Sequence, residues 1–395
     1  MITFKTIYKD KKSRARVGEL HTPHGIVETP AFVPVGTQAT VKSLTPDDLK
    51  TIGVQILFGN TYHLHLRPGE EIVEQFGGLG KFMHWSGVTM TDSGGFQVFS
   101  LARSSSGEAN LVKITEDGVI FRSHLDGSKH TFTPEQSIAI QKRIGADIIL
   151  AFDQCTTYPI THANAKADME RTHRWAIRSL EAFRNPLISP PREGAGGGFS
   201  QALYGIVQGS IFEDLRKESA EFIASQNFDG IAIGGVSVGE TKKEMQEAVD
   251  RSVPYLPENK VRHLLGIGDV DDIFEIVERG IDTFDCVTPS RLGRVGHIFV
   301  HPPEGSVRNR FRYDVTKSLF SQSSEPLSIG CECYVCQTFT RGYIHHLFRA
   351  KELLAYRLAT YHNIHFIINL TKKIRESLLE NRFAEMKKKW LHVHG

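Results

Sequence analysis

The stretch Thr283-Phe284-Asp285-Cys286-Val287-Thr288-Pro289-Ser290-Arg291 indicates the fold most directly. Its β-branched and aromatic residues predict a short strand with a carboxylate at its end, and Pro289 prevents the strand from continuing. A single Asp in such a position is more often a cap or a turn residue. Four other apolar runs, however, also end in polar groups suited to chemistry: residues 88–92, 148–153, 203–208 and 231–235. Strands that end together place such groups on one rim, so Asp285 is the candidate centre of an active site.

Apolar runs of strand length alternate with helical patterns along most of the chain. The expected strands cover residues 30–35, 54–58, 88–92, 148–153, 203–208, 231–235, 261–265 and 283–286. This alternation favours an α/β fold with a closed parallel sheet, the (β/α)8 or TIM barrel, over an open doubly wound sheet. In such a barrel the carboxyl-terminal ends of the strands carry the chemistry.

Segments outside this alternation suggest how the chain is divided. Residues 104–132 predict an inserted hairpin, because a strand-like run precedes the turn sequence Asp126-Gly127. Residues 288–330 are irregular and basic, and helical patterns follow at residues 343–361 and from residue 367 onward. We expect a catalytic barrel over residues 1–320, a zinc-binding subdomain over residues 321–366 and a C-terminal helix over residues 367–395 that packs back on the barrel. The subdomain is then an insertion between the last strand and the last helix.

The composition excludes several classes of protein. The chain has 395 residues, of which 40% are hydrophobic and 23% charged, as in an ordinary globular enzyme. A net charge of +2 excludes a general polyanion binder, so any contact with nucleic acid must be local. No apolar run reaches the ~20 residues that span a bilayer, and the start lacks a signal-peptide pattern. We therefore expect a cytoplasmic protein without a membrane partner.

Three of the five cysteines lie close together, in the pattern Cys331-x-Cys333-x-x-Cys336. Three thiolates at this spacing can surround one tetrahedral zinc ion, with a fourth ligand from elsewhere in the chain. His345, His346, His362 and His365 are all candidates, and the spacing does not choose among them. The alternative is three unliganded reduced thiols. A closed site of this kind would be structural, with one zinc per chain.

The acids at the strand ends can have different chemical roles. Asp92 and Asp285 can form a pair in which one carboxylate attacks and the other moves protons, as in double displacement at a glycosidic bond. Asp153 can accept two parallel hydrogen bonds from an amidine-like edge such as that of guanine. Gln208 can donate to a carbonyl group, and Phe96 can stack on a planar base. Taken singly, each residue is more often a cap, a turn or a packing residue.

Basic residues follow the candidate nucleophile, beginning with Arg291 and Arg294. Charged runs are usually solvated surfaces, but this one lies next to the expected chemistry. We therefore expect Arg291 and Arg294 to bind phosphate. A second basic stretch, residues 370–395, is as readily explained as an exposed helix face.

Several motifs, taken together, resemble the bacterial tRNA-guanine transglycosylases over nearly the whole chain, from about residue 30. No single motif is decisive, and the order in which they occur is specific. The motifs are Gly59-Asn60-Thr61-Tyr62-His63-Leu64, Asp92-Ser93-Gly94-Gly95-Phe96-Gln97, Ala151-Phe152-Asp153-Gln154-Cys155-Thr156, Gly205-Ile206-Val207-Gln208-Gly209, Gly234-Gly235-Val236-Ser237-Val238-Gly239-Glu240, Phe284-Asp285-Cys286-Val287 and the Cys cluster with Ile344-His345-His346-Leu347-Phe348-Arg349-Ala350.

The resemblance implies an irregular (β/α)8 barrel, a homodimer and exchange of guanine at the wobble position of tRNAs with a GUN anticodon. The incoming base would be 7-aminomethyl-7-deazaguanine, the precursor of queuosine. Asp285 would be the nucleophile at the ribose anomeric carbon, and Asp92 the general acid and base. The implied base pocket comprises Ser93, Phe96, Asp153, Cys155, Gln208, Gly235 and Val236. The implied zinc ligands are Cys331, Cys333, Cys336 and His362.

The chain departs from the usual pattern of this family at a few positions. Thr288 and Ser290 flank Pro289, Gln154 replaces a usual Glu, Leu265 a usual Met and Val295 a usual Asn. None of these changes removes a catalytic group. Cys155 and Val238 occupy the positions that would set the width of the pocket around the substituent of the base. Enzymes that use queuine carry Gly in place of Val238, so the resemblance implies that this pocket is too narrow for queuine.

Two other classes compete with this interpretation. A TIM-barrel glycosidase would also use two carboxylates, but it has no need for a Cys cluster and a basic insertion. A non-catalytic tRNA-binding partner subunit should have lost one of the acids, whereas this chain retains both Asp92 and Asp285.

Overall fold

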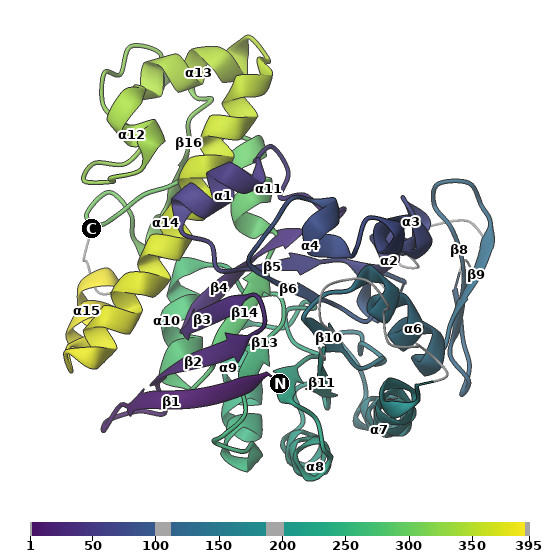
Figure 1. Ribbon diagram of the computed structural model, residues 1–395. Coiled ribbons are helices and arrows are strands. Elements are labelled where there is room, and N and C mark those ends of the chain that lie inside the picture. Colours follow the sequence, from purple (N-terminus) through teal and green to yellow (C-terminus); the bar gives the residue numbers. More distant parts are fainter. Residues whose placement is uncertain (1, 99–111, 187–200, 392–395) are drawn as a thin grey trace.

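The computed structural model describes residues 2–98, 112–186 and 201–391 (Figure 1). Its centre is a closed parallel barrel, in which β14 pairs with β4 and places Asp285 opposite Val33. This confirms the α/β barrel predicted from the sequence. The barrel strands are β4 (Ala31–Gly36), β5 (Ile56–Gly59), β6 (Val88–Thr91), β10 (Ile148–Leu150), β11 (Ala202–Val207), β12 (Gly230–Ile233), β13 (Arg262–Leu264) and β14 (Thr283–Cys286).

Helices surround the barrel, and three of them begin with a Thr capping box. In each box the Thr side chain accepts a hydrogen bond from the backbone N–H of the third helical residue. The side chain of that residue in turn accepts from the backbone N–H of the Thr. The helices between barrel strands are α1 (Pro46–Ile52), α2 (Thr61–Leu66), α3 (Glu70–Gln75), α4 (Leu79–Phe82), α6 (Pro134–Ile144), α7 (His162–Arg184), α8 (Glu213–Ser225), α9 (Lys242–Ser252), the 3-10 turn η1 (Val253–Tyr255) and α10 (Val270–Glu278).

An antiparallel sheet, which the sequence did not predict, precedes the barrel. It consists of β1 (Thr3–Lys9), β2 (Arg16–Thr22) and β3 (Gly25–Thr29). Leu20 and Val27 belong to the same buried cluster as the side chains inside the barrel. Arg16 pairs at 2.5 Å with Asp282, which directly precedes β14. The sheet therefore lies at the amino-terminal ends of the barrel strands, away from the rim that carries the chemistry (Figure 1).

A second antiparallel sheet is inserted after β6. It is formed by β7 (Val112–Ile114), β8 (Val119–Arg122) and β9 (Lys129–Phe132). The sequence predicted a hairpin over residues 104–132. The part from residue 112 onward forms three strands instead, because residues 112–114 pair with β8. Residues 104–111 lie outside the described part of the chain.

The chain after β14 is more regular than expected. Helix α11 (Thr288–Arg294) starts almost at once, with Pro289 in its first turn, where proline is compatible with a helix. The remaining elements are β15 (His297–Phe299), η2 (Val307–Asn309), β16 (Arg312–Asp314), η3 (Ser318–Phe320), α12 (Tyr334–Thr338), α13 (Arg341–Arg349), α14 (Leu353–Leu379) and α15 (Phe383–Leu391).

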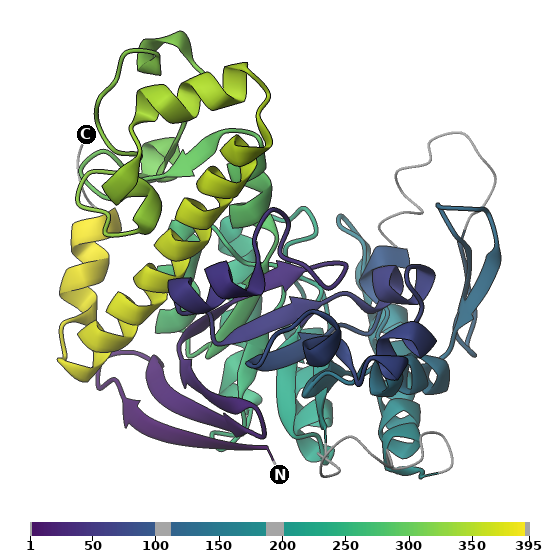
Figure 2. The same ribbon diagram turned by 45° about the horizontal axis from the view of Figure 1, so that its top comes forward.

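Helix α14 connects the inserted subdomain to the barrel. It packs on β4 and α11 and leads to α15 at the far end (Figure 2). The expected boundary between residues 366 and 367 falls inside α14, because no Gly or Pro interrupts this helix. Within the described residues, no helix is long and apolar enough to cross a membrane.

Candidate active site and metal-binding cluster

Asp92 directly follows β6, and its carboxylate is held by four N–H donors. They come from Asn60 Nδ2 at 2.5 Å, the Thr61 backbone at 2.8 Å, Gln97 Nε2 at 2.9 Å and the Gly94 backbone at 3.2 Å. Burial raises the pKa of Asp92 to about 7, and the charge of Asp285 adds to the rise. Asp92 is therefore suited to give and take a proton near neutral pH.

Asp285 lies in β14 at the same rim and is 9% exposed. Its Oδ1 accepts from the Gly266 backbone at 3.3 Å and lies 3.2 Å from His263 Nε2. An ionised carboxylate only accepts hydrogen bonds, so His263 Nε2–H is the donor in this contact. His263 Nδ1 in turn lies 2.9 Å from Thr283 Oγ1. Within the described residues, no Lys or Arg pairs with the Asp285 carboxylate, so His263 and the Gly266 N–H orient it.

The sequence did not predict His263 as part of the site. The signal was present, because His263 is a polar residue in a fully buried strand and pairs in register with Thr283 of β14. Side chains two apart in a strand lie on the same face, so Thr283 and Asp285 both point the same way. The imidazole also stacks at 6.0 Å on Phe58, which fixes its plane.

Three of the residues expected to read a base are joined by hydrogen bonds. Asp153 Oδ1 accepts from Ser93 Oγ at 3.1 Å, and its Oδ2 accepts from Gln208 Nε2 at 2.8 Å. Burial raises the pKa of Asp153 to about 6. Gln208 Oε1 is buried and has no hydrogen-bond partner within the described residues. An unpaired buried acceptor is costly and marks a place where a ligand can donate.

The other expected pocket residues lie on the loops beside this group. Gly235 has a φ of +64°, and a Cβ there would lie 2.3 Å from Gln208 Oε1, so only glycine fits. Val236 is buried, Cys155 is half-buried and follows Asp153 by two residues, and Phe96 is 47% exposed. An exposed aromatic face beside buried polar groups can stack on a planar ligand.

Arg291 and Arg294 lie on α11, which begins just after β14. Arg291 is exposed and Arg294 is half-buried. Burial lowers the pKa of Arg294, and the charge of Arg291 lowers it further. Neither guanidinium has a hydrogen-bond or ion-pair partner within the described residues. Two unpaired like charges next to the rim are suited to an anionic ligand.

The sulfurs of Cys331, Cys333 and Cys336 surround His362 Nδ1 at 3.8, 3.5 and 3.3 Å. The four ligand atoms all lie within 4.8 Å of one another, and the four residues are buried. His362 Nε2 lies 2.7 Å from the Phe299 carbonyl and donates to it, which leaves the lone pair of Nδ1 for a metal. Of the four His that the spacing left open, His362 is thus the one in the cluster. Three thiolates and one oriented imidazole fit a tetrahedral metal site.

A second group of possible metal ligands consists of three carboxylates, which already form ion pairs. Asp269, Asp271 and Asp272 lie near one another at the start of α10. Lys242 Nζ lies 3.7, 2.7 and 3.0 Å from their carboxylates. Because a lysine ammonium already occupies the centre, this cluster does not call for a metal ion.

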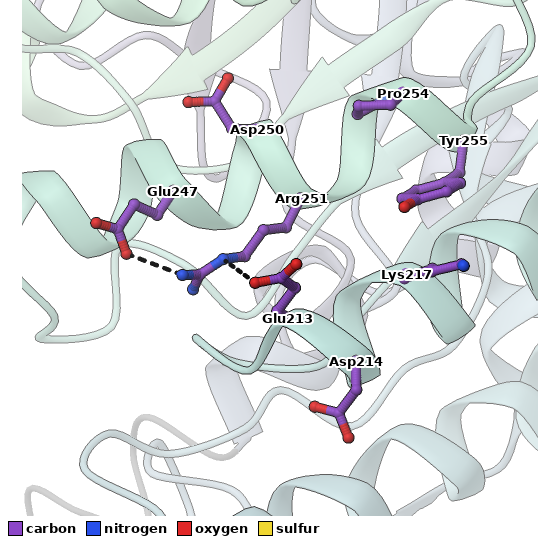
Figure 3. A pocket seen from close by; sticks show the side chains of 8 residues that line it. All are labelled: Glu213, Asp214, Lys217, Glu247, Asp250, Arg251, Pro254 and Tyr255. Atoms are coloured by element: carbon purple, nitrogen blue, oxygen red, sulfur yellow. Dashed lines mark ion pairs between the residues drawn. The ribbon is translucent and has the colours of Figure 1, made fainter.

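A groove of about 550 Å³ lies between α8 and α9 on the outside of the barrel (Figure 3). It is lined by Glu213, Asp214, Lys217, Glu247, Asp250, Arg251, Pro254 and Tyr255. Three of its charged groups pair with one another, since Arg251 lies 3.7 Å from Glu213 and 3.2 Å from Glu247. The groove contains none of the residues at the strand ends and does not bear on the chemistry.

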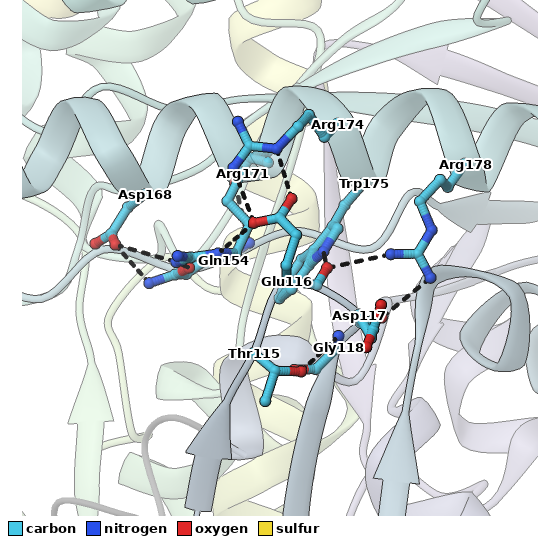
Figure 4. Close-up of polar contacts among 11 residues, drawn as sticks. Thr115, Glu116, Asp117, Gly118, Gln154, Asp168, Arg171, Arg174, Trp175 and Arg178 are labelled. Atoms are coloured by element: carbon cyan, nitrogen blue, oxygen red, sulfur yellow. Dashed lines mark hydrogen bonds and ion pairs between the residues drawn. The ribbon is translucent and has the colours of Figure 1, made fainter.

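A polar network ties the inserted sheet to the loop after β10, which contains Asp153 and Gln154 (Figure 4). The Glu116 carboxylate, between β7 and β8, accepts from Arg171 and Arg174 of α7. Arg171 also donates at 2.5 Å to Gln154 Oε1, and Gln154 Nε2 donates at 2.5 Å to Asp168. The amide at position 154 suits this place, because a carboxylate there would face the carboxylate of Asp168. This accounts for one departure from the family pattern.

An acid with a pKa near neutrality beside a second carboxylate is an arrangement for acid–base and nucleophilic chemistry. Its place at the open end of a parallel barrel defines the class, an α/β-barrel enzyme. Comparison with known proteins narrows this class. The family model described as queuine tRNA-ribosyltransferase matches residues 10–395. The chain therefore belongs to the queuine tRNA-ribosyltransferase family, the tRNA-guanine transglycosylases, which are pentosyltransferases that modify tRNA.

Individual members of this family match the chain over nearly their full length. A queuine tRNA-ribosyltransferase of Caldanaerobacter subterraneus subsp. tengcongensis is 49% identical over 390 residues, which cover 99% of this chain and 97% of the relative. That of Thermoanaerobacter sp. strain X514 is 48% identical over 394 residues, covering 100% and 98%. That of Roseiflexus sp. strain RS-1 is 46% identical over 410 residues, covering 99% and 100%.

Proposed function

We propose that this protein exchanges guanine at the wobble position of GUN-anticodon tRNAs for 7-aminomethyl-7-deazaguanine by double displacement. The observation that carries the proposal is the pairing of Asp92 with Asp285 beside the buried group of Ser93, Asp153 and Gln208. The first pair supplies the chemistry at a glycosidic bond. The second group supplies acceptors and donors for the edge of a guanine-like base.

In the first half of the reaction, a carboxylate oxygen of Asp285 forms a bond to the ribose anomeric carbon while the bond to guanine breaks. Asp92, protonated because its pKa is raised to about 7, gives its proton to the departing base. In the second half, Asp92 removes a proton from the incoming base. That base then attacks the anomeric carbon and releases the Asp285 carboxylate, so the phosphate backbone is never cut.

Base recognition follows from the donors and acceptors of the pocket. The Asp153 carboxylate accepts from N1–H and the 2-amino group of the base, an arrangement of two parallel hydrogen bonds. The second hydrogen of Gln208 Nε2 and the Gly235 N–H face the 6-oxo oxygen, and Phe96 stacks on the ring. The backbone carbonyl of Val236 receives the aminomethyl group, close to Cys155. Arg291 and Arg294 contact tRNA phosphates.

The Cys3His cluster would hold one structural zinc ion per chain. When bound, zinc would cross-link α12 to α14 and stabilise the subdomain without taking part in the chemistry. The four protein ligands leave no open coordination position for a substrate. The chain would thus consist of a catalytic barrel, a zinc-binding subdomain and a terminal helical segment that packs back on the barrel.

We further propose a homodimer in the cytoplasm. Apolar residues around α12 to α14 are exposed, among them Tyr334, Tyr343 and Leu353, which is 80% exposed. Exposed apolar groups that gather on one subdomain are typical of an interface between subunits. Reduced thiolates and a tRNA substrate are both compatible with the cytoplasm.

Labelled guanine and unmodified GUN-anticodon tRNA test the proposal directly. The enzyme should incorporate label into the tRNA, and excess 7-aminomethyl-7-deazaguanine should displace it. A barrel glycosidase would release base from a glycoside without incorporation. A non-catalytic tRNA-binding subunit would retain tRNA but leave it unlabelled. Absence of label with zinc-loaded, folded protein would overturn the proposal.

A further inference from the structure

Arg216 is a buried residue of the first turns of α8 that the proposed chemistry does not use. Its side chain is 0% exposed. Nε donates to the Ser210 carbonyl at 2.5 Å, Nη1 to the Gly234 carbonyl at 2.8 Å and Nη2 to the Gly235 carbonyl at 3.0 Å. The guanidinium therefore contacts the backbone that forms one wall of the base pocket.

The charge of Arg216 has no direct counter-ion. Within the described residues, no carboxylate oxygen lies within the 4.0 Å of an ion pair, and its partners are all carbonyl oxygens. Burial lowers the pKa of Arg216 to about 10, so the group is still charged at neutral pH. A buried cation without a paired anion is expensive. Such a cation is expected where its electric field polarises a neighbouring group.

The two glycine carbonyls belong to consecutive peptide groups. The Gly234 carbonyl shares its peptide with the N–H of Gly235, and the Gly235 carbonyl shares its peptide with the N–H of Val236. Neither N–H has a hydrogen-bond partner within the described residues, although both residues are buried. Buried backbone donors are almost always paired in a complete structure. These two are therefore available to a ligand.

The carbonyl and the N–H of a trans peptide point in opposite directions. A guanidinium that binds the carbonyl polarises the whole group and strengthens its N–H as a donor. The contact also restrains Gly235 at its φ of +64°, a conformation that the backbone would otherwise leave easily. Arg216 thus acts on both the strength and the direction of the Gly235 donor.

We propose that Arg216 is a positioning residue for base recognition, which fixes and strengthens the Gly235 N–H as the donor to the 6-oxo group of the purine. This inference rests on the proposed function, because it assigns the ligand of the Gly235 N–H to a guanine-like base. Arg216 itself does not touch the base. It selects for an oxygen acceptor at the 6-position through the backbone it holds.

The test compares two purines that differ at this position. Guanine presents oxygen, whereas 6-thioguanine keeps N1–H and the 2-amino group but presents sulfur, a weaker acceptor. Dissociation constants for both are measured by calorimetry on the full chain, for the wild type, Arg216→Met and Arg216→Lys. For each variant, the dissociation constant of 6-thioguanine is divided by that of guanine. Comparing this ratio across the variants cancels any effect of the difference in size between the two purines.

Arg262→Met is the matched control. Arg262 is also buried, burial likewise lowers its pKa to about 10, and it donates to the backbone carbonyls of Leu256 and Gly280. It lies at the first position of β13, at the opposite end of the barrel. The loss of a buried arginine there should lower thermal stability without changing the preference between the purines.

For Arg216→Met we expect guanine to bind about tenfold more weakly and 6-thioguanine less than about threefold more weakly. The preference of the wild type for guanine should then be largely lost, and Arg262→Met should retain it. If Arg216→Met does not fold, Arg216→Lys decides, because an ammonium can reach one of the two glycine carbonyls and should reduce the preference by about threefold.

Two results would overturn the inference, and they are distinguishable. If the wild type binds guanine and the Arg216 variants weaken both purines equally, Arg216 is only a packing residue and the proposed function stands. If the wild type binds neither purine, the base pocket is wrong and the inference fails together with the proposed function.

Discussion

His263 Nε2 lies 3.2 Å from Asp285 Oδ1, and this imidazole is completely buried. The proposed nucleophile is thus oriented by an imidazole whose other ring nitrogen lies 2.9 Å from Thr283 Oγ1. The buried imidazole fixes the direction of the attacking oxygen.

The first prediction concerns this contact. His263→Phe should lower kcat roughly 10- to 100-fold with little change in KM for tRNA, because the misplaced oxygen affects the chemical step. His263→Gln, which retains an N–H donor, should recover part of the loss. Thr283→Val tests the tautomer and should have a smaller effect. Equal increases in KM for all three variants would argue against a role in orientation.

The second prediction concerns the covalent intermediate. Wild-type protein mixed with unmodified tRNA should form a species that survives denaturing electrophoresis. Asp285→Ala should abolish both this species and the exchange of labelled guanine, since it removes the carboxylate that the Gly266 N–H holds at the rim. Asp285→Asn is the isosteric control and should still bind tRNA. An adduct that persists in Asp285→Ala would place the nucleophile elsewhere.

Much of the fold could be predicted, because buried strands with polar ends recur at intervals typical of a barrel. The polar strand ends at Asp92, Asp153, Gln208 and Asp285 were visible in the sequence for the same reason. The N-terminal sheet was not predicted. Its strands follow one another directly in the chain, without the intervening helix that marks a barrel strand.

The missing parts of the site share one physical cause. His263 and Arg216 act on partners 22 and 18 to 19 residues away, and the partners of Arg216 are backbone carbonyls, which carry no sequence signal. The ligand His362 was one of four equivalent candidates by spacing. The family resemblance implied His362, and the position of α14 places it in the Cys cluster.

The third prediction concerns pH. Burial raises the pKa of Asp92 to about 7, so its acid form is the one that can protonate departing guanine. The single-turnover rate of adduct formation should be level below pH 7 and fall about tenfold per pH unit above it. Asp92→Asn should be much slower and lack this dependence.

The same shift affects stability, with a defined sign. The native state holds the Asp92 proton between pH 3.8 and about 7, whereas the unfolded state releases it. The unfolding free energy should therefore fall as pH rises through this window. Thermal denaturation at pH 5 and pH 8 should show a larger drop for the wild type than for Asp92→Asn. An equal drop would mean that the folded pKa of Asp92 is not raised.

The fourth prediction concerns the metal. Cys336→Ser should lose about one zinc per chain by elemental analysis and lower the melting temperature, since metal binding contributes to folding. The barrel should keep its circular dichroism, because the cluster lies in the inserted subdomain. Cys155→Ser is the matched control and should retain zinc. Native protein without zinc would contradict the assignment.

The last prediction concerns which base enters. Val238 is half-buried, and the Glu240 carboxylate accepts from the backbone N–H groups of Ser237 and Val238. This contact holds the peptide between Val236 and Ser237, so that its carbonyl points away from Glu240. A cationic aminomethyl group can donate to that carbonyl, which offsets the cost of burying the charge.

Queuine carries a cyclopentenediol in place of this small group, and the Val238 side chain should clash with the ring. Wild-type protein should therefore use 7-aminomethyl-7-deazaguanine well, exchange guanine and use queuine poorly. Val238→Gly should raise queuine use by about tenfold, the order of discrimination that a small change in pocket size provides. Guanine exchange serves as the internal control and should change less than about twofold. Competition of both modified bases against labelled guanine measures all three, and equal use of queuine and the aminomethyl base by the wild type would refute the narrow pocket.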